Sequence, residues 1–489
     1  MKKKILTAIL ALPLLVSCGE WLDVQPKTSV EEEDLFAREY GFKDALTGFY
    51  VKMGKTMLYG QTLTYYYMDM LAGLYESAPD VYDWSAVYAY DGTYQSTVNS
   101  IYSEMYNVIA NINNFLKFVD QNRSVITTEN YYETMKGEAL GLRAFLHFDL
   151  LRMFGPADYR NNPEADAVPY RTSFDNIATP ILPASEVLDM VIEDLLAAEE
   201  LLEGHDSEIF NYDNSADPFT EMRQMRMNVW AVRAMLARVY CYKGDAESKA
   251  LALQYALDVI GSGHFTLSTY DKITTAPIMP TEQIFSLYID NYYQIVDEVF
   301  VNANASTILS AYETTVRTWY QTEADARYKT FRRVSTDGGQ FKRVSQKYNQ
   351  SYYTSSRDDY SGLNSQPLIR LPEMYYIAAE CEPDAKTAAA YLDEVISTRT
   401  GQYSTTTTTD FDKTDTRQIY GMVTGQTVRT NELMKEYLKE YYGEGQLFFF
   451  YKRFAFTDFP GCPLDNNESM ASHYQMPIPD DEFIFGNNN

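Results

Sequence analysis

Aromatic rings and polar side chains alternate in two parts of this chain, in a pattern that suits the recognition of sugars. The first part is the turn-rich stretch "ESAPDVYDWSAVYAYDGTY" at 76–94, and the second comprises "DNYYQ" at 290–294 and "RTWYQ" at 317–321. Aromatic faces stack on the C–H faces of sugar rings, while neighbouring Asp, Asn and Arg side chains hydrogen-bond the hydroxyls. The alternative use of each ring is to pack its loop onto the protein body. The candidate glycan-binding residues are Tyr82, Trp84, Tyr88, Tyr293, Trp319 and Tyr320.

Catalytic machinery is sparse in the sequence. The four histidines are scattered, and there is no H-E-x-x-H, G-x-S-x-G, Walker A or G-x-G-x-x-G motif. Glycosidase chemistry needs only two carboxylates about 5–10 Å apart, and some pair among the 68 acids will meet that distance. Asp80 or Asp83 could serve, but a solvated acid or an acceptor for sugar hydroxyls is the commoner use. We therefore expect a binding protein that is not an enzyme and holds no metal or cofactor.

Cys18 follows a short apolar run and is a candidate for lipid attachment. Met1–Lys4 carries three lysines and Ile5–Val16 is almost wholly apolar. This is the form of a secretory signal peptide, and it is too short for a spanning helix of about 20 apolar residues. Leu15-Val16-Ser17-Cys18 resembles a bacterial lipobox, in which the cysteine becomes the first mature residue and is acylated. We predict a lipoprotein signal peptide over 1–17 and a lipid anchor on Cys18. The alternative is an ordinary signal peptide with a chance cysteine.

The charge balance limits the classes of partner. The chain has 41 Lys+Arg against 68 Asp+Glu, a net charge of −27. Such a field repels the phosphate backbone, so we expect no nucleic-acid binding. It also disfavours electrostatic docking on anionic lipid, which leaves the covalent lipid as the tether. Cys241 and Cys381 lie in helical patterns, where a free cysteine is usually buried, and the sparse set with Cys462 forms no disulfide framework.

The segments that must position these residues are mostly helical. The pair at 228–263 has small residues between large apolar ones and looks like a tetratricopeptide repeat, and a similar pair follows at 371–401. Between 264 and 370 the helical period fades, and "FRRVSTDGGQFKRVSQKY" at 331–348 predicts a β-hairpin. Apolar residues recur at helical spacing over 97–120, 135–155, 185–202, 228–245, 246–263 and 371–401.

We therefore expect a mostly α-helical fold in a single domain over 18–489. Helical repeats would occupy about 97–263 and 371–452, and about 264–370 would form a large loop-rich insert that faces the ligand and contains the short β-hairpin.

Five segments, in this order, resemble the SusD/RagB family of outer-membrane lipoproteins. One departure is "KEYYGEGQLFFFYKR", where the family more often has an Arg-rich Glu-Gly-x-Arg segment, so the chain is identified as a divergent member. The resemblance implies a SusD-like α-solenoid built from tetratricopeptide-like helix pairs. The matching segments span nearly the whole mature chain and are "CGEWLDVQP", "GEALGLRAFLHFDLLRMFGP", "AMLARVYCYKGD", "IRLPEMYYIAAEC…YLDEVISTRTG" and "MPIPDDEFIFGNN".

The same resemblance implies a function. Members of the family are surface-exposed, non-catalytic glycan-binding proteins, lipid-anchored at the outer membrane, that pass oligosaccharides to a SusC-like TonB-dependent transporter. Three alternatives stay open: capture of peptides or protein fragments on the same scaffold, a surface glycosidase, and a purely structural repeat scaffold. Aromatic stacking on a defined sugar would favour glycan binding, whereas deep apolar pockets or backbone pairing would favour peptide capture.

Overall fold

The computed structural model describes the helical body and most of its connections. The described residues are 32–76, 84–205, 209–210, 217, 219–301, 308–336, 338–349, 362–401, 411–417, 421–464 and 469–486. Cys18, Tyr82, Asp80 and Asp83 lie outside these ranges, so lipid attachment at Cys18 and sugar contact by Tyr82 stay predictions. Among the described helices, none has the length and apolar character needed to cross a membrane.

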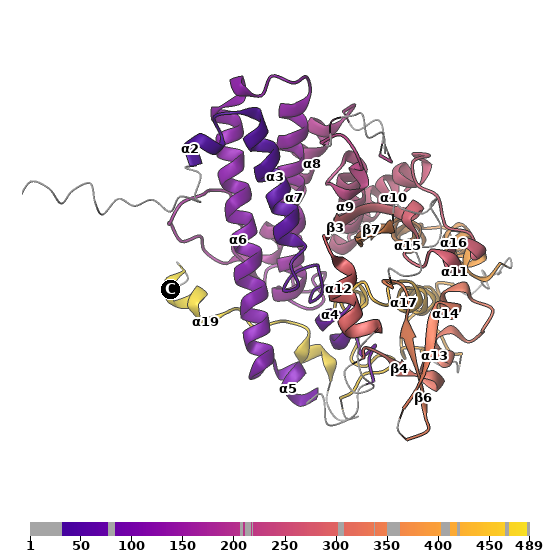
Figure 1. The fold of residues 1–489 in the computed structure, drawn as a ribbon. Helices are drawn as coiled ribbons and strands as arrows, with labels where there is room; N and C mark the ends of the chain where they lie inside the picture. Colours follow the sequence, from indigo (N-terminus) through magenta and orange to yellow (C-terminus); the bar gives the residue numbers. More distant parts are fainter. Residues whose placement is uncertain are drawn as a thin grey trace, which may run out of the picture.

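Long helices pack side by side and form one half of the body (Figure 1). α7 lies at the centre of this half, between α6 and α8, and nearly all of its residues are buried. Gly137 on α7 permits the close approach of α8, because a Cβ there would lie 2.7 Å from Leu202 Cγ. The helices of this half are α2 (Glu32–Leu35), α3 (Glu39–Met53), α6 (Thr93–Gln121), α7 (Tyr131–Phe154) and α8 (Ala184–Leu202), and the short helices α4 (Tyr67–Leu71) and α5 (Trp84–Ala89) lie between α3 and α6 in the chain.

Two helix pairs extend the body away from α7, as the repeat pattern predicts. Asn228 caps α9 by accepting from Ala231 N, and Asp245 caps α10 by accepting from Ser248 N, both at 2.9 Å. Gly244 ends α9 with a φ of 75°, a left-handed conformation that favours glycine. The two pairs are α9 (Val229–Lys243) with α10 (Ala246–Gly261), and α15 (Leu371–Cys381) with α16 (Ala385–Thr400).

The insert contains the predicted hairpin, together with other short strands and short helices. β5 (Phe331–Ser335) pairs antiparallel with β6 (Phe341–Ser345), and β4 (Ala311–Tyr312) adds a third strand beside β6. A separate antiparallel pair joins β3 (Gln283–Tyr288) to β7 (Ser365–Arg370). The insert also holds α11 (Tyr270–Thr275), α12 (Tyr292–Val296), α13 (Glu313–Tyr320) and α14 (Ala326–Lys329). Short helices of one or two turns give too few periods for the sequence pattern to reveal them.

The C-terminal part returns along the whole body. α17 (Val428–Glu440) and α18 (Leu447–Arg453) pack in the second half, and the chain then crosses to α19 (Asp480–Phe485), which lies beside α6 in Figure 1. The remaining strands, β1 (Asp166–Val168) and β2 (Leu182–Pro183), form a short pair next to α7 and α8. The mostly α-helical fold is thus confirmed.

A buried ion cluster joins α16, α17 and β7. Arg370 on β7 and Arg399 on α16 are fully buried, and both donate to Glu440 of α17, at 2.7 and 3.0 Å. Arg327 of α14 donates to the same carboxylate at 2.8 Å. Burial alone would raise the pKa of Glu440, but the three guanidinium groups hold it well below its usual range. Glu440 is the one carboxylate that all three arginines share, and each arginine has a further acid partner in the cluster.

Replacing Glu440 tests this cluster. Glu440→Gln keeps the shape but removes the carboxylate that all three guanidinium groups share, while Glu282 still pairs with Arg370 and Arg399 and Asp325 still pairs with Arg327. We therefore expect a loss of about 1.5–3 kcal/mol in the free energy of unfolding, the contribution of a buried hydrogen bond to a charged group. Glu247→Gln, an exposed glutamate on α10, is the matched control and should change stability by less than about 0.5 kcal/mol. Denaturant unfolding measures both. A loss below about 1 kcal/mol for Glu440→Gln would contradict the assigned role.

A second buried acid has the opposite titration behaviour. Asp69 of α4 accepts backbone N–H bonds from Gly443 at 2.6 Å and Gly445 at 2.9 Å, which fixes the turn before α18. Burial raises the pKa of Asp69 to about 7, against the opposing effect of the two N–H donors. The folded protein therefore binds this proton more tightly than the unfolded chain.

Asp69 should make stability depend on pH. Between its ordinary 3.8 and about 7, the unfolded chain carries fewer protons on this group than the folded one, so the free energy of unfolding falls as pH rises. Each factor of ten in proton affinity contributes about 1.4 kcal/mol, which gives a fall of about 4 kcal/mol from this group. Asp69→Asn should flatten the profile, while Asp384→Asn, at an exposed cap, should not. Equal slopes in wild type and Asp69→Asn would refute the assignment.

Candidate functional site

A groove of about 900 Å³ runs between α6, the loop at 169–178 and the C-terminal segment that carries α19. We call it the α6–α19 groove. Its volume lies within the range typical of ligand sites, and its walls combine aromatic rings with amide, hydroxyl and carboxyl groups. The exposed polar residues Gln95, Asn99 and Ser103 follow one face of α6 at a spacing of four residues.

Two tyrosines of α6 line the inner part of the groove. The rings of Tyr102 and Tyr106 lie 4.7 Å apart between centroids, and the Tyr106 hydroxyl donates to Pro169 O at 2.7 Å. The Tyr102 hydroxyl is buried and has no hydrogen-bond partner of good geometry. Burial and the nearby Glu482 carboxylate raise the pKa of Tyr102, so its hydroxyl keeps its proton at neutral pH. It can therefore donate to an acceptor in the groove.

The loop wall depends on a buried pair between α7 and α8. Arg143 of α7 donates through Nε and Nη2 to the two oxygens of Asp194 on α8, both at 2.7 Å, and buried Tyr170 donates to Asp194 at 2.6 Å. Arg143 Nη1 also donates to Asn113 Oδ1 on α6 at 2.9 Å. These bonds bring α6, α7, α8 and the start of the loop to one point.

His147 and Asn113 fix the next residues of the loop. His147 Nε2 accepts from Arg171 N at 3.0 Å, so Nδ1 carries the hydrogen and donates to Arg143 O at 2.9 Å. Burial lowers the pKa of His147 to about 3, which keeps the ring neutral at physiological pH. Asn113 Nδ2 donates to Arg171 O at 2.9 Å. Both ring nitrogens of His147 are thus hydrogen-bonded within the core.

The C-terminal wall is attached to the end of α7. Met476 N donates to Met153 O at 3.1 Å, and Gln475 Nε2 donates to Phe154 O at 2.9 Å. The segment then presents Asp480, Asp481 and Glu482 to the groove. The α6 wall, the loop wall and the C-terminal wall are therefore all hydrogen-bonded to α7, although they come from distant parts of the chain.

The structure places the predicted aromatic residues in different environments. Tyr88 is 1% exposed, and Trp319 and Tyr320 are each 3% exposed. Tyr88 lies in α5, and the other two lie in α13, so the expectation that they sit on ligand-facing loops is wrong. Their rings pack into the core and offer no free face. Trp84 is half-buried and stacks on Tyr88, whereas Tyr293 is 46% exposed on α12. Sugar contact by Trp84 and Tyr293 stays a prediction.

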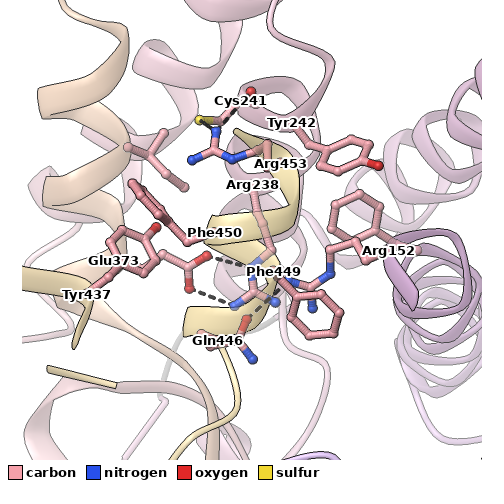
Figure 2. A pocket seen from close by; sticks show the side chains of 12 residues that line it. Arg152, Arg238, Cys241, Tyr242, Glu373, Tyr437, Gln446, Phe449, Phe450 and Arg453 are labelled. Carbon is pink, nitrogen blue, oxygen red and sulfur yellow. Dashed lines mark hydrogen bonds and ion pairs between the residues drawn. The ribbon is translucent and has the colours of Figure 1, made fainter. Parts of the chain in front are cut away.

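Figure 2 shows a second, much smaller cavity of about 40 Å³ near α9, α15 and α18. Arg238 donates to both oxygens of Glu373 at 2.6 Å, and Arg453 Nη1 donates to Cys241 Sγ at 3.0 Å. The space holds about one water molecule. We interpret this cavity as a small gap in the packing around buried, paired charges. Cys241 is buried there, as the helical pattern predicts.

The sequence analysis does not identify the residues of the α6–α19 groove, because the walls come from segments around 95–110, 169–178 and 479–486 that lie far apart in the chain. Among the described residues, no three His, Cys, Asp or Glu side chains form a group that could hold a metal ion. What the groove offers is a set of hydrogen-bonding groups around aromatic rings, which suits binding.

Two family models match the chain. One, described as starch-binding and associating with the outer membrane, matches residues 20–241, and the other, described as the SusD family, matches residues 268–483. Two curated relatives from Formosa agariphila are similar: SusD-like protein P38, 26% identical over 270 residues, and SusD-like protein P2, 25% identical over 261 residues. The matches cover 54% and 53% of this chain but 46% of each relative, so the chain matches about half the length of these proteins.

Solved structures share the fold. A SusD superfamily protein from Bacteroides thetaiotaomicron has a TM-score of 0.70 at 22% identity, covering 91% of this chain and 98% of that one. A putative sugar binding protein from Bacteroides vulgatus has a TM-score of 0.67 at 22% identity, covering 92% and 97%. A SusD-like carbohydrate binding protein from the same species has a TM-score of 0.66 at 17% identity, with the same coverage.

The role of His147 in fixing the loop wall can be tested. His147→Leu removes the acceptor of the buried Arg171 N–H, so we expect hydrogen exchange across 169–178 to become about tenfold faster, the equivalent of about 1.4 kcal/mol. The amides of α6 and α7 should stay protected. His264→Leu, the same substitution beside Trp230, is the control and should leave the loop unchanged. Unchanged exchange in His147→Leu would show that the loop is held by other contacts.

Proposed function

The chain belongs to the SusD/RagB family, and from this premise we propose that it captures glycans at the outer membrane and binds them in the α6–α19 groove. The observation that carries the proposal is the groove itself: about 900 Å³, lined by Tyr102, Tyr106, amides, hydroxyls and acids. Sugar ligands need this combination of ring faces and hydrogen-bonding rims. The names of two structural neighbours, which mention sugar or carbohydrate binding, are consistent with it.

The acids of the groove favour binding over hydrolysis. A glycosidase needs one carboxyl group that stays protonated near neutral pH, usually because an apolar environment raises its pKa. Asp480 and Asp481 are exposed, and hydrogen bonds from the Ser173 hydroxyl and Ile177 N–H lower the pKa of Asp175. These groups suit the role of acceptors for sugar hydroxyls. We therefore propose a capture protein that does not cleave its ligand.

The tether and the partner complete the proposal. A lipid on Cys18 would hold the protein at the outer membrane, with the body facing the cell exterior. The captured oligosaccharide would pass to a SusC-like TonB-dependent transporter. The support for both steps is the lipobox-like sequence before Cys18 and the family match, whose description mentions association with the outer membrane.

Peptide capture is the second candidate, and one observation favours it. Phe174 and Ile177 on the loop are exposed large apolar side chains that line the groove. Phe483 and Ile484 on α19 are also exposed and follow the lining residue Glu482 in the chain. Such a rim could contact apolar side chains of a peptide. We prefer glycans because the interior of the groove is dominated by polar groups and tyrosines.

Blocking the groove tests the proposal. Ser103→Trp places a large ring on the exposed face of α6, and we expect it to weaken binding to the best ligand of a polysaccharide panel at least tenfold. Tyr102→Phe removes one donor from the groove and should weaken binding several-fold. Calorimetry or affinity electrophoresis measures both, with analysis of the ligand after incubation to confirm that it is not cleaved.

Control variants distinguish the groove from the sugar-binding surface predicted from the sequence. We call this second location, at Trp84 and Tyr293, the aromatic surface. Ser397→Trp places the same ring on α16 and should leave affinity unchanged, as should Trp84→Ala and Tyr293→Ala. Loss of binding in Trp84→Ala or Tyr293→Ala, with Ser103→Trp unaffected, would move the site to the aromatic surface. Preferential binding of peptides in the groove would favour the second candidate.

A further inference from the structure

The charges around the α6–α19 groove are unbalanced. Its described lining residues include the acids Asp175, Asp480, Asp481 and Glu482, and a single basic residue, Arg171. The α6 wall contributes only neutral groups, such as Gln95, Asn99, Ser100 and Ser103. The groove thus presents an excess of negative charge to any ligand that enters it.

Arg171 does not offset this excess, because its guanidinium group is engaged within its own loop. Nη2 donates to Asp175 O at 3.2 Å and Ile177 O at 3.1 Å, and it lies 3.6 Å from Asp175 Oδ1. An anionic ligand would have to break these contacts to use Arg171. The charges of Asp175 and Arg171 therefore neutralise each other, and the acids of α19 determine the electrostatic potential in the groove.

The acids of α19 differ in their position. Asp480 and Asp481 are exposed at the start of the helix, whereas Glu482 is half-buried and close enough to Tyr102 and Tyr106 to raise the pKa of both hydroxyls. A ligand in the groove would thus contact a carboxylate beside the Tyr102 hydroxyl, which is buried without a partner of good geometry. One group accepts hydrogen bonds and the other donates one, a pair that suits an amine next to a hydroxyl or ring oxygen.

The net charge of the whole chain also favours cationic ligands over anionic ones. Its net charge of −27 repels polysaccharides that carry carboxylate or sulfate and attracts cations, most strongly in a concave site with low ionic strength. Between a neutral and a cationic sugar of the same size, the groove should therefore favour the cationic one.

We infer that the α6–α19 groove selects glycans that carry protonated amino groups, such as glucosamine units, and rejects uronic-acid and sulfated glycans. The inference rests on the proposed function, because it names the ligand class of the same site. Asp480, Asp481 and Glu482 bind the amine, and the Tyr102 hydroxyl and the amides of α6 bind the sugar oxygens.

Matched oligosaccharides test the inference on the purified full-length protein in detergent. The probes are glucosamine oligomers, N-acetylglucosamine oligomers of the same length, oligogalacturonate and oligolysine, each titrated by calorimetry. We expect glucosamine oligomers to bind at least tenfold more tightly than their N-acetylated counterparts, and oligogalacturonate not to bind. The preference should shrink at about 0.5 M salt, where charges are screened within a few ångströms.

Charge-removing variants locate the effect. Asp480→Asn with Asp481→Asn should reduce the preference for glucosamine over N-acetylglucosamine at least fivefold, because it should weaken binding of the charged oligomers far more than binding of the N-acetylated ones. Glu247→Gln with Glu394→Gln removes the same charge from α10 and α16, on the other side of the body from α19 (Figure 1), and should change nothing.

The outcomes separate this inference from the proposed function. Equal or tighter binding of N-acetylated oligomers, lost in Ser103→Trp, would overturn the amine preference and keep glycan capture in the groove. Oligolysine binding as tight as that of glucosamine oligomers would also overturn it, since the groove would then respond to charge alone. Failure of every glycan to bind would overturn both.

Discussion

The fork between Arg143 and Asp194 is the interaction on which the candidate site depends. The pair is buried, Tyr170 donates a third hydrogen bond to Asp194, and Arg143 donates a fourth to Asn113. It thus links three long helices to the loop that forms one wall of the groove. An ion pair at this depth stabilises the fold only when its remaining hydrogen-bonding groups are satisfied. Here the further hydrogen-bond partners of the Arg143–Asp194 pair, Tyr170 and Asn113, are also the residues that position the loop.

The other walls of the groove are also held in place by α7. α7 carries Arg143 and His147 in its interior and accepts hydrogen bonds from the C-terminal segment at Met153 and Phe154, so the loop wall and the C-terminal wall are attached to one helix. The second half of the body is held separately by the cluster around Glu440. A capture site formed by a helix face, a short loop and a C-terminal segment needs such a frame, because none of its walls is stable alone.

Much of the fold could be predicted from the sequence, and most of the site could not. The long helices, with apolar residues at helical spacing, and the hairpin at Phe331–Ser345 have strong local patterns, and the structure confirms them. Trp319 and Tyr320 were misassigned because "RTWYQ" resembles an exposed loop, although Val316, Trp319 and Tyr320 follow helical spacing and are buried. The groove joins segments around 99, 171 and 481, and local patterns carry no information about such distant contacts. The polar face of α6, with Gln95, Asn99 and Ser103 four residues apart, was the one available signal.

A crystal structure of the protein with its tightest-binding oligosaccharide tests the central claim most directly. We expect sugar density in the α6–α19 groove, against Tyr102 and Tyr106, with Glu482 within hydrogen-bond distance of the ligand. Density over α12 at Tyr293 or beside Trp84, with an empty groove, would contradict it and return the site to the aromatic surface predicted from the sequence.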